Sequence, residues 1–195
     1  MRGSHLVALL PCVALLACAT SMPVEPAGPP PVWKLASASV ATGNDIRGTG
    51  NRGPISESIQ GRSITGSRWD LVVTGGHLRG TGNTEEVIDI SIGTDKAEGM
   101  VHAAPFSASI AIEPAGGAHV SGSLAGSNID FTITPQAMNG RIGNAMYNLN
   151  WNPDKQQYEG QMTPGGNAFL KLPVVMATWS DAKVVTVVAL LLIGA

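Results

Sequence analysis

The sequence predicts an all-β domain, an antiparallel up-and-down meander that closes or nearly closes into a barrel, and three observations carry this prediction. Short runs alternate apolar and polar residues, a glycine recurs about every 20 residues among them, and turn-forming residues separate them. No segment shows the apolar period of 3.6 residues that is typical of an amphipathic helix. We expect roughly ten to twelve strands, with a β-solenoid as the alternative architecture.

The alternating runs justify the strands one by one, because a period of two places every second side chain on the same face of a sheet. Turn-formers lie between the runs, as in AGSN at 125–128 and NPDK at 152–155, where Pro153 suits the second position of a type I turn. The runs are WDLVV (69–73), IDISI (88–92), FSASIAI (106–112), IDFTI (129–133), YNLNW (147–151) and FLKLPVV (169–175).

A recurring glycine precedes most of these runs and divides the domain into repeats of about 20 residues, each of which predicts two strands. In VSGSL (120–124) the glycine shares a face with Val120 and Leu124. An inward glycine loses packing, but it lets a strand coil sharply, as a small closed barrel requires. The glycines of the series are Gly48, Gly61, Gly80, Gly99, Gly122, Gly140 and Gly160.

The strongly apolar run at 184–193 is too short to cross a bilayer as a helix. We expect it to be a strand, which either closes the barrel against the first strand or lies beneath a loop. Only 5% of the chain is aromatic, whereas barrels embedded in a membrane carry aromatic girdles. A barrel outside the membrane is therefore predicted.

The N-terminal segment has the three-part layout of a secretory signal: Arg2, the apolar stretch 6–16, and small residues around Cys18. Leu15-Leu16-Ala17-Cys18 resembles the lipobox of bacterial lipoproteins, and this resemblance covers the leader alone. It implies that residues 1–17 are a signal peptide and that Cys18 becomes the acylated N-terminus, carrying fatty acids such as palmitate. An ordinary signal peptide that is cut near Ala17 or Ala19 is the alternative.

Cysteine usage agrees with acylation, because Cys12 and Cys18 both lie in the leader and no disulfide can form within residues 19–195. The residue after Cys18 is Ala19, which by the same resemblance favours the outer membrane, with the domain facing the periplasm or the cell surface. Residues 18–32 are proline-rich and predict an extended tether, and residues 33–195 predict a single β domain.

Charge and motifs argue against several functions. The formal net charge of −2 gives no basic footprint for nucleic acid. GTGNRG (48–53) matches a dinucleotide fingerprint but lacks a following helix, and GRSITG (61–66) is too long for a nucleophile elbow. The histidines after the leader are interpreted as solvated surface residues: His77, His102 and His119. The carboxylates near a strand start are interpreted as a charged strand edge that discourages aggregation: Glu85, Glu86 and Asp89.

We therefore expect no enzyme, and no catalytic, cofactor or metal site. The sequence favours a lipid-anchored protein of the cell envelope with a structural or interaction role. Its partners would be the membrane, through acylated Cys18, and another envelope protein. The alternative is a carrier that encloses a small apolar ligand in a lipocalin-like barrel.

Overall fold

The computed structural model describes residues 43–82, 87–113 and 116–194. Within these residues the chain forms fourteen strands, one short 3₁₀ helix and one α-helix. The elements are β1 (Asp45–Gly50), β2 (Gly53–Gln60), β3 (Ser63–Gly66), β4 (Trp69–Thr74), β5 (His77–Gly82), β6 (Val87–Ile92), β7 (Lys96–Val101), β8 (Ala104–Ile112), β9 (Ala118–Leu124), β10 (Ser127–Ile133), β11 (Ala137–Ile142), β12 (Ala145–Asn152), β13 (Gln157–Thr163), β14 (Gly166–Lys171), η1 (Val174–Thr178) and α1 (Asp181–Ile193).

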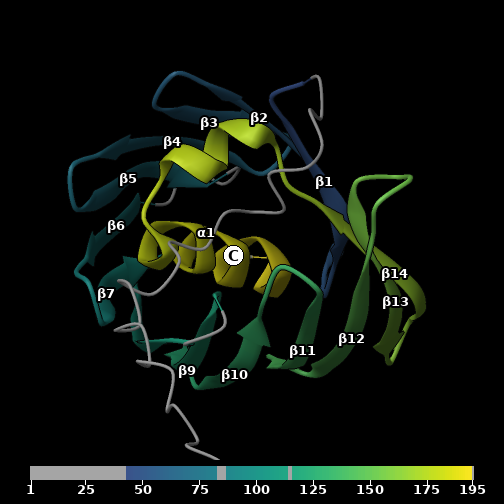
Figure 1. Cartoon of the computed structure of the whole chain (residues 1–195). Coiled ribbons are helices and arrows are strands. Elements are labelled where there is room, and N and C mark those ends of the chain that lie inside the picture. The colour runs from purple at the N-terminus through teal and green to yellow at the C-terminus, as the bar shows by residue number, and fades with distance from the viewer. Residues whose placement is uncertain (1–42, 83–86, 114–115, 195) are drawn as a thin grey trace, which may run out of the picture.

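The strands form a closed antiparallel meander, in which each strand pairs with its neighbours in sequence and β14 pairs with β1 (Figure 1). The predicted barrel is confirmed, although the fourteen strands in the described residues exceed the ten to twelve expected. The closing seam is short, since its register joins Arg47 to Lys171 and Gly48 to Leu170. The other neighbouring pairs have longer ladders, such as the seven residue pairs between β12 and β13.

The barrel wall is apolar inside and polar outside, as alternation predicts. In β4 the side chains of Trp69 and Leu71 are buried, whereas Asp70 and Thr74 are exposed. A barrel that contacts lipid hydrocarbon has the opposite arrangement, with apolar residues outside. The described part of the wall is therefore built to face water.

Five of the seven recurring glycines lie at inner-face positions near the middle of β5, β7, β9, β11 and β13. Gly48 lies within β1, whereas Gly61 lies in the exposed turn between β2 and β3. Gly122 stands opposite Ala108 on β8 and Ile129 on β10. A Cβ atom placed on Gly122 would lie 2.7 Å from the Cα of Ala108 and would also collide with the carbonyl oxygen of Ser107. The backbones of adjacent strands therefore approach closely at this point, which only glycine allows.

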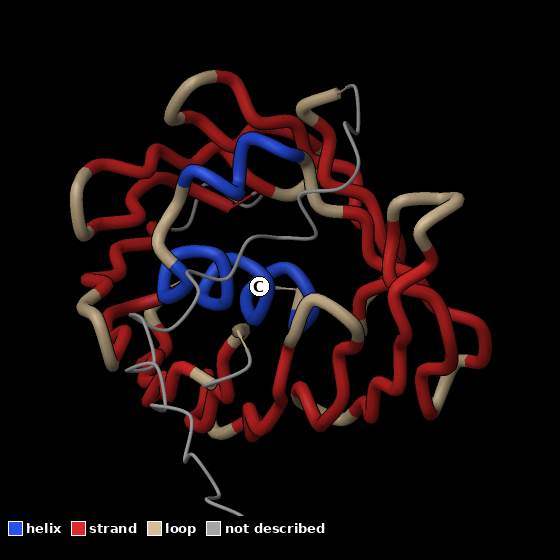
Figure 2. Tube along the Cα trace, in the orientation of Figure 1, coloured by secondary structure: helices blue, strands red, loops and turns tan. Residues whose placement is uncertain are grey.

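The C-terminal apolar run is an α-helix inside the barrel, so the prediction of a strand is wrong (Figure 2). Because β14 already closes the sheet, a further strand in the interior would leave its backbone N–H and C=O groups without partners. A helix pairs these groups within itself, and a barrel this wide needs a filling. The helix begins after Ser180 and ends at Gly194, whose φ of 77° is left-handed and whose N–H donates to the carbonyl of Leu190.

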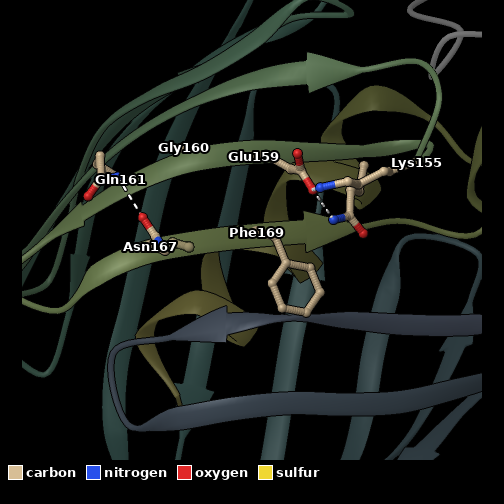
Figure 3. A pocket seen from close by; sticks show the side chains of 8 residues that line it. Lys155, Glu159, Gly160, Gln161, Asn167 and Phe169 are labelled. Carbon is tan, nitrogen blue, oxygen red and sulfur yellow. Dashed lines mark hydrogen bonds and ion pairs between the residues drawn. The ribbon is translucent and has the colours of Figure 1, made fainter.

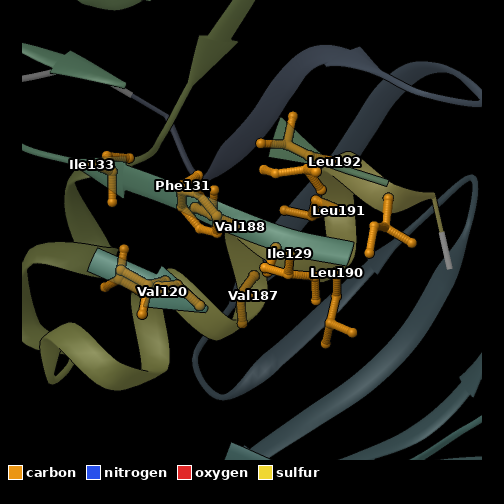
Figure 4. Packing of buried hydrophobic residues seen from close by; sticks show 14 of the residues in the cluster. Val120, Ile129, Phe131, Ile133, Val187, Val188, Leu190, Leu191 and Leu192 are labelled. Carbon is orange, nitrogen blue, oxygen red and sulfur yellow. The ribbon is translucent and has the colours of Figure 1, made fainter. Parts of the chain in front are cut away.

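Helix α1 packs against the inner face of the wall, and nearly all of its side chains are buried. It contacts β1, β6, β7, β8, β9 and β11. Figure 4 shows Ile129 and Phe131 of β10 beside Val187 and Val188 of the helix. The hydroxyl of Thr186, a polar group in this apolar environment, donates to the carbonyl of Ala182 at 2.7 Å. In the described parts of the chain, no helix has the length and apolarity required to cross a bilayer.

Candidate functional site

A cluster of polar residues fixes the C-terminal end of α1 to the wall. The backbone N–H of Asn51 donates to the carbonyl of Leu192 at 2.8 Å, and the guanidinium of Arg68 lies 3.4 Å from the carbonyl of Leu191. The hydroxyl of Tyr147 donates to Asn51 Oδ1 at 2.9 Å, and burial raises the pKa of Tyr147, so this hydroxyl keeps its proton. These groups satisfy helix carbonyls that have no partner within α1. The cluster therefore holds the helix in place.

Glu57 is the buried carboxylate nearest to this cluster, with a relative exposure of 2%. Its Oε1 accepts a hydrogen bond from the backbone N–H of Arg68 at 3.1 Å and lies 3.4 Å from the hydroxyl of Ser67. Burial raises the pKa of Glu57 above 4.5, although the N–H of Arg68 opposes the shift. When folding raises the pKa of an acid, the native state loses stability as the pH rises. The loss begins near the pKa that the acid has in the unfolded chain and is complete above the pKa that it has in the folded chain.

Replacing this carboxylate should therefore remove a pH-dependent loss of stability. We expect the melting temperature of Glu57→Gln, relative to that of the unsubstituted protein, to be higher at about pH 7 than at about pH 4. Thermal melts at both pH values measure this difference. Glu98→Gln, which changes an exposed glutamate on β7, is the control. A Glu57→Gln difference that does not depend on pH would contradict the assignment.

A groove with a volume of about 470 Å³ on the outer face of the described barrel runs along β13 and β14. Its rims carry outward side chains of both strands, and its floor is formed by Gly160 and Ala168, which stand opposite each other. Figure 3 shows these rims, with Glu159 and Gln161 on one strand and Asn167 and Phe169 on the next. We call this the β13–β14 groove.

Hydrogen bonds fix the polar side chains of the β13–β14 groove. Glu159 accepts from Lys155 Nζ at 2.8 Å, from the amide of Gln157 at 2.5 Å and from the amide of Asn152 at 2.9 Å. The bond from Lys155 is the largest cause that lowers the pKa of Glu159, followed by the bonds from Gln157 and Asn152. Glu159 is therefore ionised at neutral pH, and its charge is balanced by Lys155. Farther along the groove, the amide of Gln161 donates to Asn167 Oδ1 at 2.8 Å.

Another groove, of about 430 Å³, crosses the outer faces of β9 to β12. His119 Nδ1 lies 3.0 Å from Thr132 Oγ1, and His119 Nε2 lies 3.5 Å from Asp130 Oδ1. This order of hydroxyl, imidazole and carboxylate is formally that of a nucleophilic triad. The backbone N–H groups of β9 and β10 are engaged in their ladder, however, and the face is open to water. We interpret the three groups as ordinary cross-strand contacts.

The structure keeps the other sequence candidates apart. His77 is exposed at the start of β5, and His102 lies in the turn between β7 and β8, away from His119. The described residues contain no group of three or more histidine, cysteine, aspartate or glutamate side chains that could hold a metal ion. Asp89 pairs with Arg79 at 2.9 Å on the outer face. Cys18, Glu85 and Glu86 lie outside the described residues.

The glycine-rich motifs are hairpins. GTGNRG (48–53) forms the end of β1, a two-residue turn and the start of β2, where Gly50 stands opposite Gly53. A dinucleotide fingerprint needs a helix after the turn, and here a strand follows. GRSITG (61–66) covers the next turn and β3. Both motifs belong to the barrel wall.

Comparison of the chain with family models, with curated proteins and with solved structures finds no match. The candidate site is thus defined by the geometry of this chain. Sequence reasoning missed the β13–β14 groove, although one signal for it was present: Gln157, Glu159 and Gln161 alternate along one run and so share a face.

Proposed function

We propose that the protein is a non-enzymatic lipoprotein of the bacterial cell envelope, anchored in the outer membrane through acylated Cys18. In this proposal the proline-rich tether holds the barrel away from the lipid surface, and the barrel acts as an interaction module. The observation that carries the interaction role is the position of α1, which occupies the interior. Because the inside is filled by the chain itself, the polar outer face with its grooves is the surface available to partners.

A carrier of a small apolar ligand is the second candidate, since the inner face of the wall is apolar and barrels of this kind enclose such ligands. Helix α1 lies where the ligand would lie, so binding would require the helix to leave. Native mass spectrometry of the purified protein separates the two candidates. A small molecule retained at a fixed stoichiometry would support the carrier, and the mass of the chain and its lipid alone would support the interaction module.

The anchor is tested by replacing the cysteine that carries it. We expect Cys18→Ser to abolish lipid attachment and to release or mislocalise the protein, because the hydroxyl of serine cannot form the thioether. Labelling cells with a clickable fatty acid measures attachment, and Cys12→Ser is the matched control. Each buried methylene of an acyl chain contributes about 0.8 kcal/mol, so the loss of several chains removes essentially all membrane affinity. Label that persists on Cys18→Ser would show that the proposed anchor is wrong.

A further inference from the structure

We propose that the β13–β14 groove is a binding site for a neutral saccharide chain. This inference deepens the interaction role proposed above and rests on it, but it does not depend on acylation of Cys18. It rests on three properties of the groove: the balance of its charges, the fixed geometry of its amides, and an aromatic ring at its edge.

The charges of the groove favour a neutral ligand. Lys155 and Glu159 form an ion pair at 2.8 Å, and the remaining polar side chains, Gln157, Gln161 and Asn167, are amides. The groove therefore presents no net charge to attract a phosphate, a carboxylate or a cation. An amide offers both a donor and an acceptor, which suits hydroxyl groups because they also donate and accept. A surface of this kind matches a ligand that is rich in hydroxyl groups.

The amides are held ready for a ligand. In the bond between Gln161 and Asn167, the Gln161 amide group donates and the Asn167 oxygen accepts. The carbonyl oxygen of Gln161 and the amide nitrogen of Asn167 take no part in this bond and can meet the hydroxyl groups of a ligand. The bonds from Lys155 and Gln157 fix Glu159 in the same way. Side chains that are already ordered lose little conformational entropy on binding.

Phe169 supplies the apolar part of the site. It lies on the outward face of β14 opposite Glu159, and its ring is half-buried at the edge of the groove, on the side of β1 (Figure 3). The negatively polarised face of an aromatic ring attracts the C–H groups that line one face of a sugar ring. An aromatic ring beside fixed amides therefore offers a sugar both a stacking surface and hydrogen bonds.

The shape of the groove suits a chain. It follows β13 from Gln157 to Gln161, which at about 3.3 Å per residue is about 13 Å, long enough for more than one sugar unit. Gly160 and Ala168 belong to the inner face of the wall, so on the outer face the floor between the two rims is backbone without a side chain. A linear oligosaccharide lying along the strands would contact the amides at one end and Phe169 toward the middle.

The experiment is titration calorimetry on the full-length lipidated chain, purified in a detergent without a sugar headgroup. The probes are hexamers of the malto-, cello- and N-acetylchito-oligosaccharide series. We expect at least one series to bind, Phe169→Ala to weaken that binding about tenfold or more, and Gln161→Ala to weaken it about threefold to tenfold. Met100→Ala, which removes an exposed apolar side chain from β7, should bind as the unsubstituted protein does.

Binding by none of the three series would overturn the proposal, as would binding that survives both Phe169→Ala and Gln161→Ala unchanged. Thermal melts of the variants exclude a loss of fold as the cause, because both side chains lie on the outer face. Fatty-acid labelling of Phe169→Ala separates this proposal from the proposed anchor. If Phe169→Ala loses saccharide binding but is still labelled with the fatty acid, the result supports the saccharide site. If the unsubstituted protein is not labelled at Cys18, the proposed anchor is wrong and the saccharide result is unaffected.

Discussion

A chain that ends at residue 180 is expected not to fold into a cooperative barrel, because it lacks the helix that fills the interior. Eight large apolar side chains of α1 are buried: Val184, Val185, Val187, Val188, Leu190, Leu191, Leu192 and Ile193. Each contributes roughly 1.5–3 kcal/mol, so their sum exceeds or matches the 5–15 kcal/mol that stabilises a typical domain. Truncation also leaves the inner face of the wall without a packing partner.

Circular dichroism and size-exclusion chromatography measure the result, with aggregation and the loss of a sharp melt as the expected outcome. Val188→Asp should have a similar effect in the full-length chain, because it buries an unpaired charge against β10. Lys183→Ala changes a partly exposed residue of the same helix and is the control. A monodisperse truncated protein that melts cooperatively would show that the barrel does not need α1.

The second large effect is expected at the inward glycines. Gly122→Val should lower the free energy of unfolding by at least about 3 kcal/mol, the upper end of ordinary overpacking, because the new atoms meet backbone rather than a side chain that can move. For a chain of this size each kcal/mol corresponds to roughly 2–4 °C in melting temperature.

Gly75 provides the matched control for this prediction. It lies in the turn between β4 and β5, its φ is +55°, and a Cβ atom there would meet nothing within 4 Å. Gly75→Ala should therefore cost only the roughly 1–2 kcal/mol of a left-handed conformation. A melting temperature of Gly122→Val that is equal to or higher than that of Gly75→Ala would contradict the close approach of β8 and β9.

The sequence was sufficient to predict the wall of the barrel, because alternation and turn residues are local signals. The runs at 88–92 and 129–133 lie within β6 and β10. The number of strands was underestimated, because short strands such as β3, with four residues, carry little alternation. The state of residues 184–193 could not be read from the sequence. Valine-rich segments favour strands, and only the empty space inside a closed wall makes a helix the better structure.

For the candidate sites, too, local sequence signals and features that depend on the fold have to be distinguished. The acylation of Cys18 stays a prediction from a contiguous run that resembles a lipobox, and Cys18 lies outside the described residues. The alternation of Gln157, Glu159 and Gln161 along one run was a local signal for a shared face, but it was not used. The pairing of Gln161 with Asn167 depends on the register between two strands, and alternation alone does not fix that register. The position of Phe169 beside these amides follows from the same register.

The place of α1 in the chain has a consequence for the order in which the protein matures. The helix follows all fourteen described strands in sequence, yet it lies within them, and the seam joins β1 to β14 across more than a hundred residues. A chain that is made from its N-terminus therefore displays hairpins whose apolar faces stay exposed to water until the last segment arrives. Pairing between such distant segments is slow, and the exposed faces are prone to aggregation meanwhile. The nascent domain thus passes through a long period in which its inner face is unprotected, and that period ends only when α1 has been made.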